Sequence, residues 1–299
     1  MADLLALLWA PFLMCLVLTG IHAYLGIHVL AREVVFVDIA LAQIAAFGAT
    51  AAFLFDFTLE SPVSYAFGLG ATLLGAVVLA LTRSRERHVS QEAVIGVVYA
   101  VSAAATVLLM ANAPHGAEHL RGMLVGNIIT VSPSEVAKVA VLYAAVGLLH
   151  WLCRRPFFLI STDPETAFRE GWRVRLWDFV FYASFGLVVT SSVRIAGVLL
   201  VFAYLIVPAL AGTALGTSIG SRLLIGWGFG TLVSVVGIAA SATLDLPTGA
   251  TVVCVFGAAL LLGWAFVRTS GRSAPSRRGV RVHALRPGSN PARGESVKR

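Results

Sequence analysis

Charged residues are scarce in this sequence. Asp, Glu, Lys and Arg together make up 12% of its 299 residues, while 58% are hydrophobic. Soluble domains carry about 25% charged residues, so the scarcity excludes an ordinary soluble globular protein. A disordered chain is excluded as well, because disorder needs low hydrophobicity and high charge. The class that remains is an all-α, polytopic integral membrane helical bundle, in which apolar segments of about 20 residues cross the bilayer as helices.

Cysteine is also rare, and familiar catalytic motifs are missing. The three cysteines, Cys15, Cys153 and Cys254, are too few and too scattered for a disulfide framework or a C-x-x-C metal site. The sequence contains no G-x-x-x-x-G-K-[ST], no H-E-x-x-H and no G-x-S-x-G. It therefore cannot bind ATP by a P-loop or hydrolyse a substrate by these routes. Any nucleotide that drives its activity would have to act through another subunit.

The net charge of +7 comes from one segment. Residues 268–299 hold nine Lys and Arg residues and one acidic residue, Glu295. We therefore expect a transmembrane permease domain at 1–267 and a basic, disordered cytoplasmic tail at 268–299, rich in Ser, Gly, Pro and Arg. Such a tail would keep the C-terminus in the cytoplasm and contact anionic membrane lipid. A charge confined to a tail is a weak reason to expect nucleic acid, and we predict no nucleic-acid partner.

Apolar runs predict eight or nine transmembrane helices. They cover residues 4–30, 34–55, 61–82, 91–111, 135–153, 176–193, 195–215, 222–243 and 248–267. Eight remains the competing count, because Ser191, Ser192 and Arg194 interrupt a single long apolar stretch. With nine spans and the N-terminus outside, 19 of the 22 Lys and Arg residues fall in cytoplasmic segments. This positive-inside asymmetry predicts a multi-pass protein of the cell membrane with a cytoplasmic C-terminus.

Two polar residues stand on the small-residue span at 34–55. An ionisable group in a span faces a partner, a cavity or a transport path, so structural pairing and transport both remain open for Asp38. Gln43 lies deeper, where hydrogen bonding between helices is favoured. At 100° per residue the two side chains point about 140° apart around the helix. One ion on the axis therefore cannot face both of them unless the helix bends or a symmetry mate contributes.

Other polar residues lie at the starts of spans or in the outer loop at 112–134. Three carboxylates begin spans, where they complement the positive end of the helix dipole: Glu92, Glu135 and Asp178. His22 and His28 fall on opposite faces of the first span, which argues against one shared site. His115 and His119 have a metal-ligand spacing if their segment is helical. The proline and glycine beside His115 favour a solvated loop instead.

Five segments are informative together. The clearest is RIAGVLLVFAYLIVPALAG at 194–212, in which a glycine, an aliphatic run and a proline lead into small residues. The others are LDLPTGATVV with Asp245, Pro247 and Gly249, PETAFREG with Glu165, Ala167 and Gly171, EAVIGVVY at Glu92, and LVGNIITVSPSE at Leu124. In this order they resemble the permease subunits of ABC importers for zinc and manganese. The likeness runs from about residue 15 to 268.

The resemblance implies a permease subunit of an ATP-driven importer for a divalent metal ion, zinc or manganese, with nothing bound permanently. The implied partners are a second copy in a homodimer, a cytoplasmic ATP-binding subunit and an extracytoplasmic metal-binding protein. In this interpretation the loop at 154–175 holds a short coupling helix that docks on the ATPase, with Glu165, Ala167, Phe168, Gly171 and Trp172 as coupling residues. Phe168 and Trp172, four apart, would share an apolar face. The competing interpretation is a solvated amphipathic connector on the membrane.

The second span departs from the family pattern. Such permeases show an Asp and a His four apart, then a glycine five further on. Aligned on Gly48, Gln43 takes the place of the histidine and Asp38 stands one place early. We expect Asp38 and Gln43 to line the translocation path, with Asp38 as the metal ligand. A carboxamide is a weaker, harder ligand than imidazole, so a metal chelate or vitamin-like cargo is an alternative. A membrane-embedded enzyme is a third hypothesis, but it predicts paired catalytic residues that we do not find.

Overall fold

The protein is described by a computed structural model that covers residues 2–58, 61–83, 90–111, 116–126 and 128–269. The chain divides into two compact units, Met1–Leu260 and Leu261–Arg299. The helix bundle belongs to the first unit. In the second unit the described residues are the end of the last helix, and the predicted basic tail lies outside the described residues from 270 onward. Its cytoplasmic, lipid-contacting role stays a prediction.

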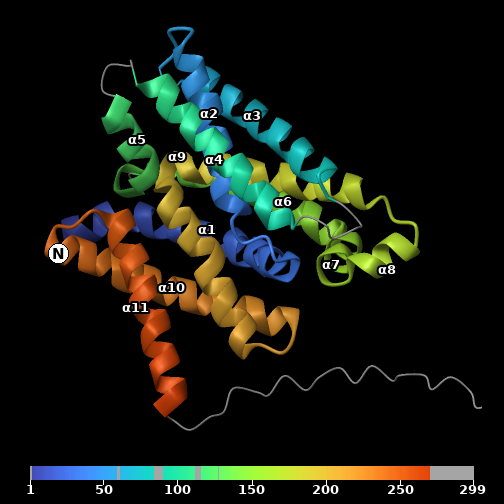
Figure 1. Cartoon of the computed structure of the whole chain (residues 1–299). Coiled ribbons are helices and arrows are strands. Elements are labelled where there is room, and N and C mark those ends of the chain that lie inside the picture. The colour runs from blue at the N-terminus through green and yellow to red at the C-terminus, as the bar shows by residue number, and fades with distance from the viewer. Residues whose placement is uncertain (1, 59–60, 84–89, 112–115, 127, 270–299) are drawn as a thin grey trace, which may run out of the picture. The chain divides into compact units, whose positions relative to one another are not determined.

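The described residues form helices and no strands (Figure 1). The α-helices are α1 (Ala2–Arg32), α2 (Val37–Phe53), α3 (Pro62–Leu81), α4 (Gln91–Met110), α5 (Gly116–Val125), α6 (Pro133–Leu152), α7 (Arg154–Thr162), α8 (Pro164–Arg169), α9 (Val174–Leu215), α10 (Ile219–Leu244) and α11 (Thr248–Thr269); a 3-10 turn, η1, covers Ile128–Thr130. Seven of the described helices are long and apolar enough to cross a membrane, and α2 is a shorter apolar helix of 17 residues. The prediction of a polytopic helical membrane protein is confirmed.

The 42-residue helix α9 corrects the predicted break between two spans. From the sequence we predict this break at Ser191, Ser192 and Arg194. All three residues are helical, and the backbone leaves helical geometry at Gly197 instead (φ 77°, ψ 158°). Both serine hydroxyls donate to the carbonyl of Val188 one turn back, at 2.9 and 2.7 Å. The serines therefore satisfy their polar atoms within the helix and do not interrupt it. The two predicted spans are the two halves of α9.

The loop expected after Met110 is also corrected, because it contains α5. Residues 116–125 are helical, and Gly116 is the first residue of the helix. A glycine at that position is tolerated, since its N–H needs no partner within the helix. His115 and the side chain of His119 lie outside the described residues, so the metal-ligand spacing stays untested. Among the residues that are described, no group of three or more His, Cys, Asp and Glu side chains could hold a metal ion.

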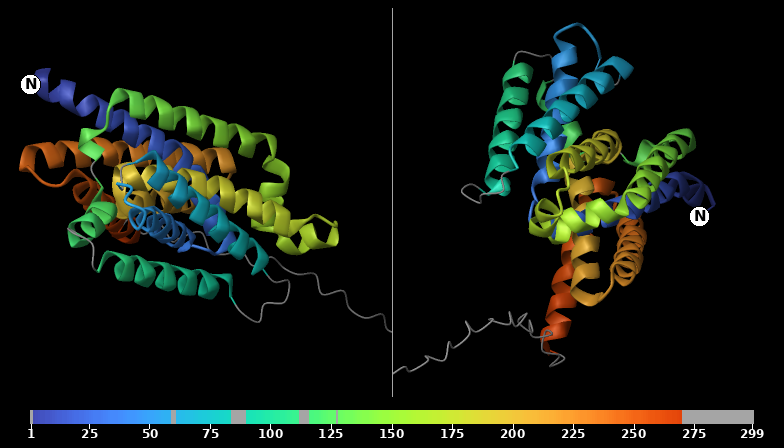
Figure 2. Two further views of the ribbon diagram at one scale, coloured as in Figure 1. Left: turned by 90° about the horizontal axis from the view of Figure 1, so that it is seen from above. Right: turned by 90° about the vertical axis from the view of Figure 1, so that its right-hand side faces the viewer.

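Helix α9 is the centre of the packing. It contacts α3 on one side and α10 on another, and α1 packs along it (Figure 2). Helix α2 packs against α3, α4 and α9. At Gly48 a Cβ atom would lie 2.6 Å from the carbonyl oxygen of Phe67, so the backbones of α2 and α3 are in direct contact. The small residues of α2 therefore do what their composition predicts, which is to let neighbouring helices approach closely.

Candidate translocation site

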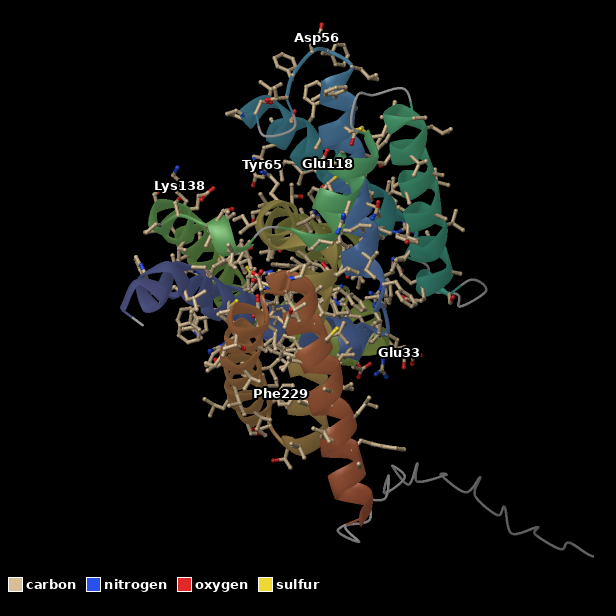
Figure 3. The ribbon with its side chains drawn as sticks, turned by 90° about the vertical axis from the view of Figure 1, so that its left-hand side faces the viewer. Glu33, Asp56, Tyr65, Glu118, Lys138 and Phe229 are labelled. Atoms are coloured by element: carbon tan, nitrogen blue, oxygen red, sulfur yellow. The ribbon has the colours of Figure 1, made fainter. Side chains whose placement is uncertain are left out.

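A cavity of about 260 Å³ lies among α2, α3, α5 and α9. Helix α2 contributes only small side chains to its wall: Ala45, Ala46 and Ala49. Five side chains with polar groups also line it: Ser64 and Tyr65 of α3, Glu118 of α5, and Thr190 and Arg194 of α9. The Arg194 guanidinium lies 5.2 Å from the centre of the Tyr65 ring. Figure 3 shows Tyr65 and Glu118 at the end of the bundle that carries Asp56. We call this space the outer cavity.

Asp38 lies on the same face of α2 as the alanines of the outer cavity. Ala45 and Ala49 are seven and eleven residues further on, about 20° to either side of Asp38 around the helix and about 10 and 16 Å along its axis. The Asp38 side chain is buried, at 1% exposure. Its Oδ1 atom has no hydrogen-bond partner among the described residues. The ion pairs of the described residues do not include Asp38 either, so the structure gives no support to structural pairing.

Gln43 is placed differently. It is half-buried and does not line the outer cavity. Because α2 is helical at both positions, the Gln43 and Asp38 side chains point about 140° apart around the helix axis. Asp38 therefore shares a face of α2 with two alanines of the outer cavity without lining the cavity itself, and Gln43 lies on another face of α2. A place for Gln43 in the translocation path stays a prediction.

Three consecutive hydroxyl residues of α9 join the outer cavity to a buried polar cluster. Thr190 lines the cavity and its hydroxyl lies 3.1 Å from that of Thr72 on α3. The Ser191 Oγ lies 3.2 Å from the Tyr143 hydroxyl oxygen. Ser192 Oγ lies 3.3 Å from a ring nitrogen of a buried histidine of α1. On the sequence alone we interpret Ser191 and Ser192 only as part of an interruption and do not consider Thr190. A run of three hydroxyl residues in an apolar helix was the signal that could have identified the cluster.

That histidine is His22, and the cluster also reaches Asp38. The rings of His22 and Tyr143 meet edge to face with centroids 6.0 Å apart. The Asp38 carboxyl lies within electrostatic range of the Tyr143 hydroxyl. His28 belongs elsewhere, since its Nδ1 lies 2.9 Å from Ser161 Oγ of α7. The expectation that His22 and His28 do not share a site is therefore confirmed.

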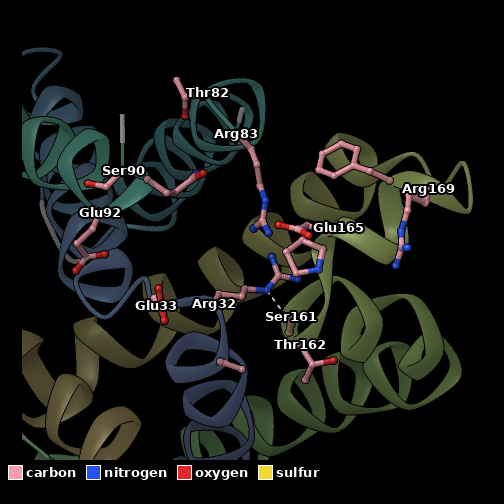
Figure 4. Close-up of a pocket in the computed structure, with 14 residues that line it drawn as sticks. Arg32, Glu33, Thr82, Arg83, Ser90, Glu92, Ser161, Thr162, Glu165 and Arg169 are labelled. Carbon is pink, nitrogen blue, oxygen red and sulfur yellow. Dashed lines mark hydrogen bonds between the residues drawn. The ribbon is translucent and has the colours of Figure 1, made fainter. Parts of the chain in front are cut away.

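A larger cavity, of about 760 Å³, lies at the opposite end of α3 (Figure 4). It is lined by the end of α1, the end of α3, the start of α4 and the α7–α8 segment. Its charged lining residues are Arg32, Glu33, Arg83, Glu92, Glu165 and Arg169. Three of the segments predicted to share one side of the membrane, 31–33, 83–90 and 154–175, therefore contribute to this one cavity. We call it the inner cavity.

A buried ion cluster next to the inner cavity corrects the interpretation of Asp178. Arg32 Nη1 donates to Asp178 Oδ1 at 2.6 Å, and Arg83 Nε lies 3.1 Å from Asp178 Oδ2. The side chains of Arg32 and Asp178 are fully buried. A helix dipole alone does not explain this carboxylate, which pairs with two arginines, one at the end of α1 and one just after α3. For Glu135 the helix-start interpretation is confirmed, because it completes a capping box with Ser132.

The predicted coupling residues lie on and after the short helix α8. Ala167 is buried, and Phe168 and Trp172 are half-buried against the small apolar cluster that it forms with Ile160 and Val174. Phe168 and Trp172 do share an apolar contact, but not by helical spacing, because α8 ends at Arg169. The chain turns between them, at Gly171 with φ of +77°. Glu165 is exposed and lines the inner cavity.

The start of α8 is fixed by its own cap. Asp163 accepts a hydrogen bond from the Thr166 backbone N–H at 3.0 Å. Hydrogen bonds from the Thr166 side chain and backbone hold the pKa of the Asp163 carboxyl below its ordinary value. Because the charged form accepts these bonds, α8 keeps a capped first turn at neutral pH.

Three glycines from different helices meet beside the outer cavity. Gly126 ends α5, Gly197 is the break in α9, and Gly249 begins α11. A Cβ on Gly126 would lie 2.2 Å from the carbonyl carbon of Ala196, one on Gly197 would lie 2.4 Å from the Gly126 nitrogen, and one on Gly249 would lie 2.6 Å from the carbonyl oxygen of Val125. Gly126 and Gly197 both have positive φ, at 66° and 77°. We call this contact the glycine crossing.

Comparisons with known proteins agree with this architecture. The chain is 25% identical over 225 residues, 75% of its own length and 77% of the relative's, to the manganese transport system membrane protein MntC of Halalkalibacterium halodurans. It is 27% identical over 199 residues to the manganese import system permease protein ScaB of Streptococcus parasanguinis, covering 64% of this chain and 71% of that one.

Two solved structures share the fold. The first is PsaBC from Streptococcus pneumoniae in complex with Fab, with a TM-score of 0.72 and 19% identity over 90% of this chain and 98% of that one. The second is an inward-facing metal-chelate type ABC transporter, with a TM-score of 0.62 and 18% identity over 87% and 85% of the two chains. Residues 5–267 match the ABC 3 transport family. The chain therefore belongs to the ABC 3 transport family, and the resemblance found in the five sequence segments is confirmed.

Proposed function

We propose that this permease imports a free divalent metal ion, manganese in preference to zinc, by using ATP hydrolysed on a separate subunit. The observation that carries the proposal is the buried Asp38 carboxylate, whose Oδ1 has no hydrogen-bond partner among the described residues. A buried carboxylate oxygen without a partner is costly. A cation that reaches it from the outer cavity would remove that cost. Membership of a transport family and relatives named for manganese transport support the same function.

The donor chemistry around Asp38 favours manganese. Oxygens dominate in the polar cluster that Asp38 reaches, from the Asp38 carboxylate and the hydroxyls of Tyr143 and Ser192, with one imidazole from His22. Oxygen donors suit the harder Mn²⁺, whereas Zn²⁺ prefers more nitrogen and sulfur. A single carboxylate also binds weakly, which suits an ion that must leave again.

The inner cavity supports an assignment of sides and partners. By the positive-inside rule, its basic segments support a cytoplasmic location for that end of the bundle. Helix α8, exposed at Glu165 and half-exposed at Phe168, is then the element offered to the ATP-binding subunit. The full transporter would contain two copies of this chain, the ATP-binding subunits and an extracytoplasmic metal-binding protein. The chain itself would carry out no ATP hydrolysis.

Ion uptake by proteoliposomes tests the proposed function. The permease, reconstituted with its ATP-binding subunit and metal-binding protein, should take up Mn²⁺ only with hydrolysable ATP, and Zn²⁺ more slowly. Non-hydrolysable ATP is the control. Uptake of a metal chelate with exclusion of both free ions would show the alternative cargo and overturn the proposal, as would Mn²⁺ uptake that needs no ATP-binding subunit.

The coupling assignment predicts a loss of subunit binding. Phe168→Glu should reduce co-purification of the ATP-binding subunit by at least about tenfold, because a charge replaces an apolar contact at the centre of the docking surface. Thr217→Glu is the matched control, since it adds the same charge to an exposed loop expected on the same side of the membrane. Equal co-purification of the two variants would contradict the assignment.

A further inference from the structure

The α7–α8 segment has a polar connection to the membrane helices through Ser161. This serine lies at the end of α7, two residues before the Asp163 cap of α8. Its hydroxyl accepts a hydrogen bond from Arg32 Nε at 2.9 Å and lies 2.9 Å from His28 Nδ1. Arg32 and His28 both belong to α1. Ser161 therefore lies between α8 and the end of α1, so a displacement of α8 would shift Ser161 before it shifts α1.

Arg32 passes this connection on to two further helices. Its Nη1 donates to Asp178 of α9, and Asp178 in turn pairs with Arg83 at the end of α3. The Arg32 guanidinium also lies over the Phe181 ring of α9, 3.9 Å from its centre. Figure 4 shows Arg32 and Arg83 converging on the inner cavity from different helices, with Ser161 bonded to Arg32. One buried carboxylate thus ties α1, α3 and α9 together.

The cluster is rigid because it is buried. The side chains of Arg32 and Asp178 are fully buried, and that of Arg83 is 13% exposed. Removing one partner of a buried ion pair leaves an uncompensated charge, which is strongly unfavourable. The three helices therefore keep their contact when α7 moves. By contrast, α8 faces α3 and α4 across the inner cavity of about 760 Å³, which leaves it room to shift.

The connection ends at the candidate metal site. Helix α3 is in backbone contact with α2, where Gly48 meets Phe67 and Gly68. Helix α2 carries Asp38 near its start. A series of contacts therefore runs from α8 through Ser161, the ion cluster and α3 to α2, the helix that carries Asp38.

We infer that Ser161 and the Arg32–Asp178–Arg83 ion cluster are positioning residues that transmit movement of α8 to the helices around Asp38. This inference rests on the proposed function and names the coupling device within it. None of the four residues would touch the ion or ATP. Their role would be to convert a displacement of α8 into a displacement of the helices that surround Asp38.

Substitution of Ser161 separates coupling from folding. Ser161→Ala removes the hydroxyl that joins α7 to Arg32 and leaves the ion cluster intact. In proteoliposomes that contain the full transporter, we expect the number of Mn²⁺ ions imported per ATP hydrolysed to fall at least about fivefold. The rate of ATP hydrolysis and the yield of assembled complex should stay near those of the wild type. Ser161→Thr keeps the hydroxyl and should restore most of the ratio.

A neighbouring hydroxyl gives the matched control. Thr162→Val removes a hydroxyl from the same helix, but that hydroxyl donates within the helix to the carbonyl of Phe158, and the described residues give it no hydrogen bond to another element. Its ratio of ions to ATP should stay unchanged. The inference is overturned if Ser161→Ala keeps the wild-type ratio, if Thr162→Val lowers it equally, or if Ser161→Ala loses transport only because the complex no longer assembles. Failure of the wild-type transporter to import Mn²⁺ would instead refute the proposed function.

Discussion

Asp38→Asn is expected to lower ATP-dependent Mn²⁺ uptake by about 100-fold. The substitution removes the negative charge and keeps the size of the side chain. Near a protein surface, two unit charges about 4 Å apart attract each other by roughly 4 kcal/mol, so a divalent ion loses most of its attraction to the site. Initial uptake rates of radioactive Mn²⁺ in proteoliposomes measure the effect. The protein should fold normally, because Asp38 Oδ1 has no hydrogen-bond partner to lose among the described residues.

Asp56→Asn is the matched control for this prediction. Asp56 is exposed in the turn after α2 and has a φ of 62°, a backbone conformation that Asn tolerates well. It has the same chemistry as Asp38 but lies away from the polar cluster (Figure 3). Uptake by this variant should match the wild type. If both variants transport Mn²⁺ at the wild-type rate, Asp38 is not a ligand in the path and the central observation behind the proposed function has another explanation.

Gly197→Ala is expected to destabilise the protein by more than about 3 kcal/mol. Two effects add. The backbone of Gly197, at φ 77° and ψ 158°, belongs to a region that is almost restricted to glycine, and other residues there cost on the order of 1–3 kcal/mol. The added Cβ would also lie 2.4 Å from the Gly126 nitrogen, a backbone atom that cannot rotate away. Thermal unfolding in detergent, followed by size-exclusion chromatography, measures the loss.

Gly228→Ala provides the comparison. This glycine lies in the exposed face of α10, and a Cβ there would meet no atom within 4 Å. Alanine favours helix over glycine by about 1 kcal/mol, so this variant should be as stable as the wild type or slightly more stable. Equal thermal stability of the two variants would contradict the close approach at the glycine crossing.

The apolar runs sufficed to predict the membrane helices, because hydrophobic length is a local property. The break in α9 was misplaced because a serine hydroxyl can bond to its own helix, which composition alone does not reveal. Helix α5 was missed because its glycine lies at the first position, where it does little harm. In both cases the residue type was noticed, but its position in the helix decided whether it interrupted the helix.

The candidate site was only partly predictable. Asp38 could be identified because a charge in an apolar span is unusual. The partners of Asp178 could not, since Arg32 is 146 residues away in the chain and Arg83 lies just after a third helix. The same holds for His22 and Ser192, 170 residues apart. Local patterns predict helices, whereas pairings between distant residues depend on how those helices pack.

The shortness of α2 has a consequence for the energy of permeation. Its 17 residues span only about 26 Å, less than the roughly 30 Å of the hydrocarbon core. Asp38 is the second residue of this helix. If the start of α2 faces the cytoplasm as proposed, a cation held at Asp38 would have passed most of the insulating layer. The electrostatic barrier to its release would then be low, and the chief obstacle would lie earlier, on the stretch of α2 between the outer cavity and Asp38, where this face of the helix carries alanines.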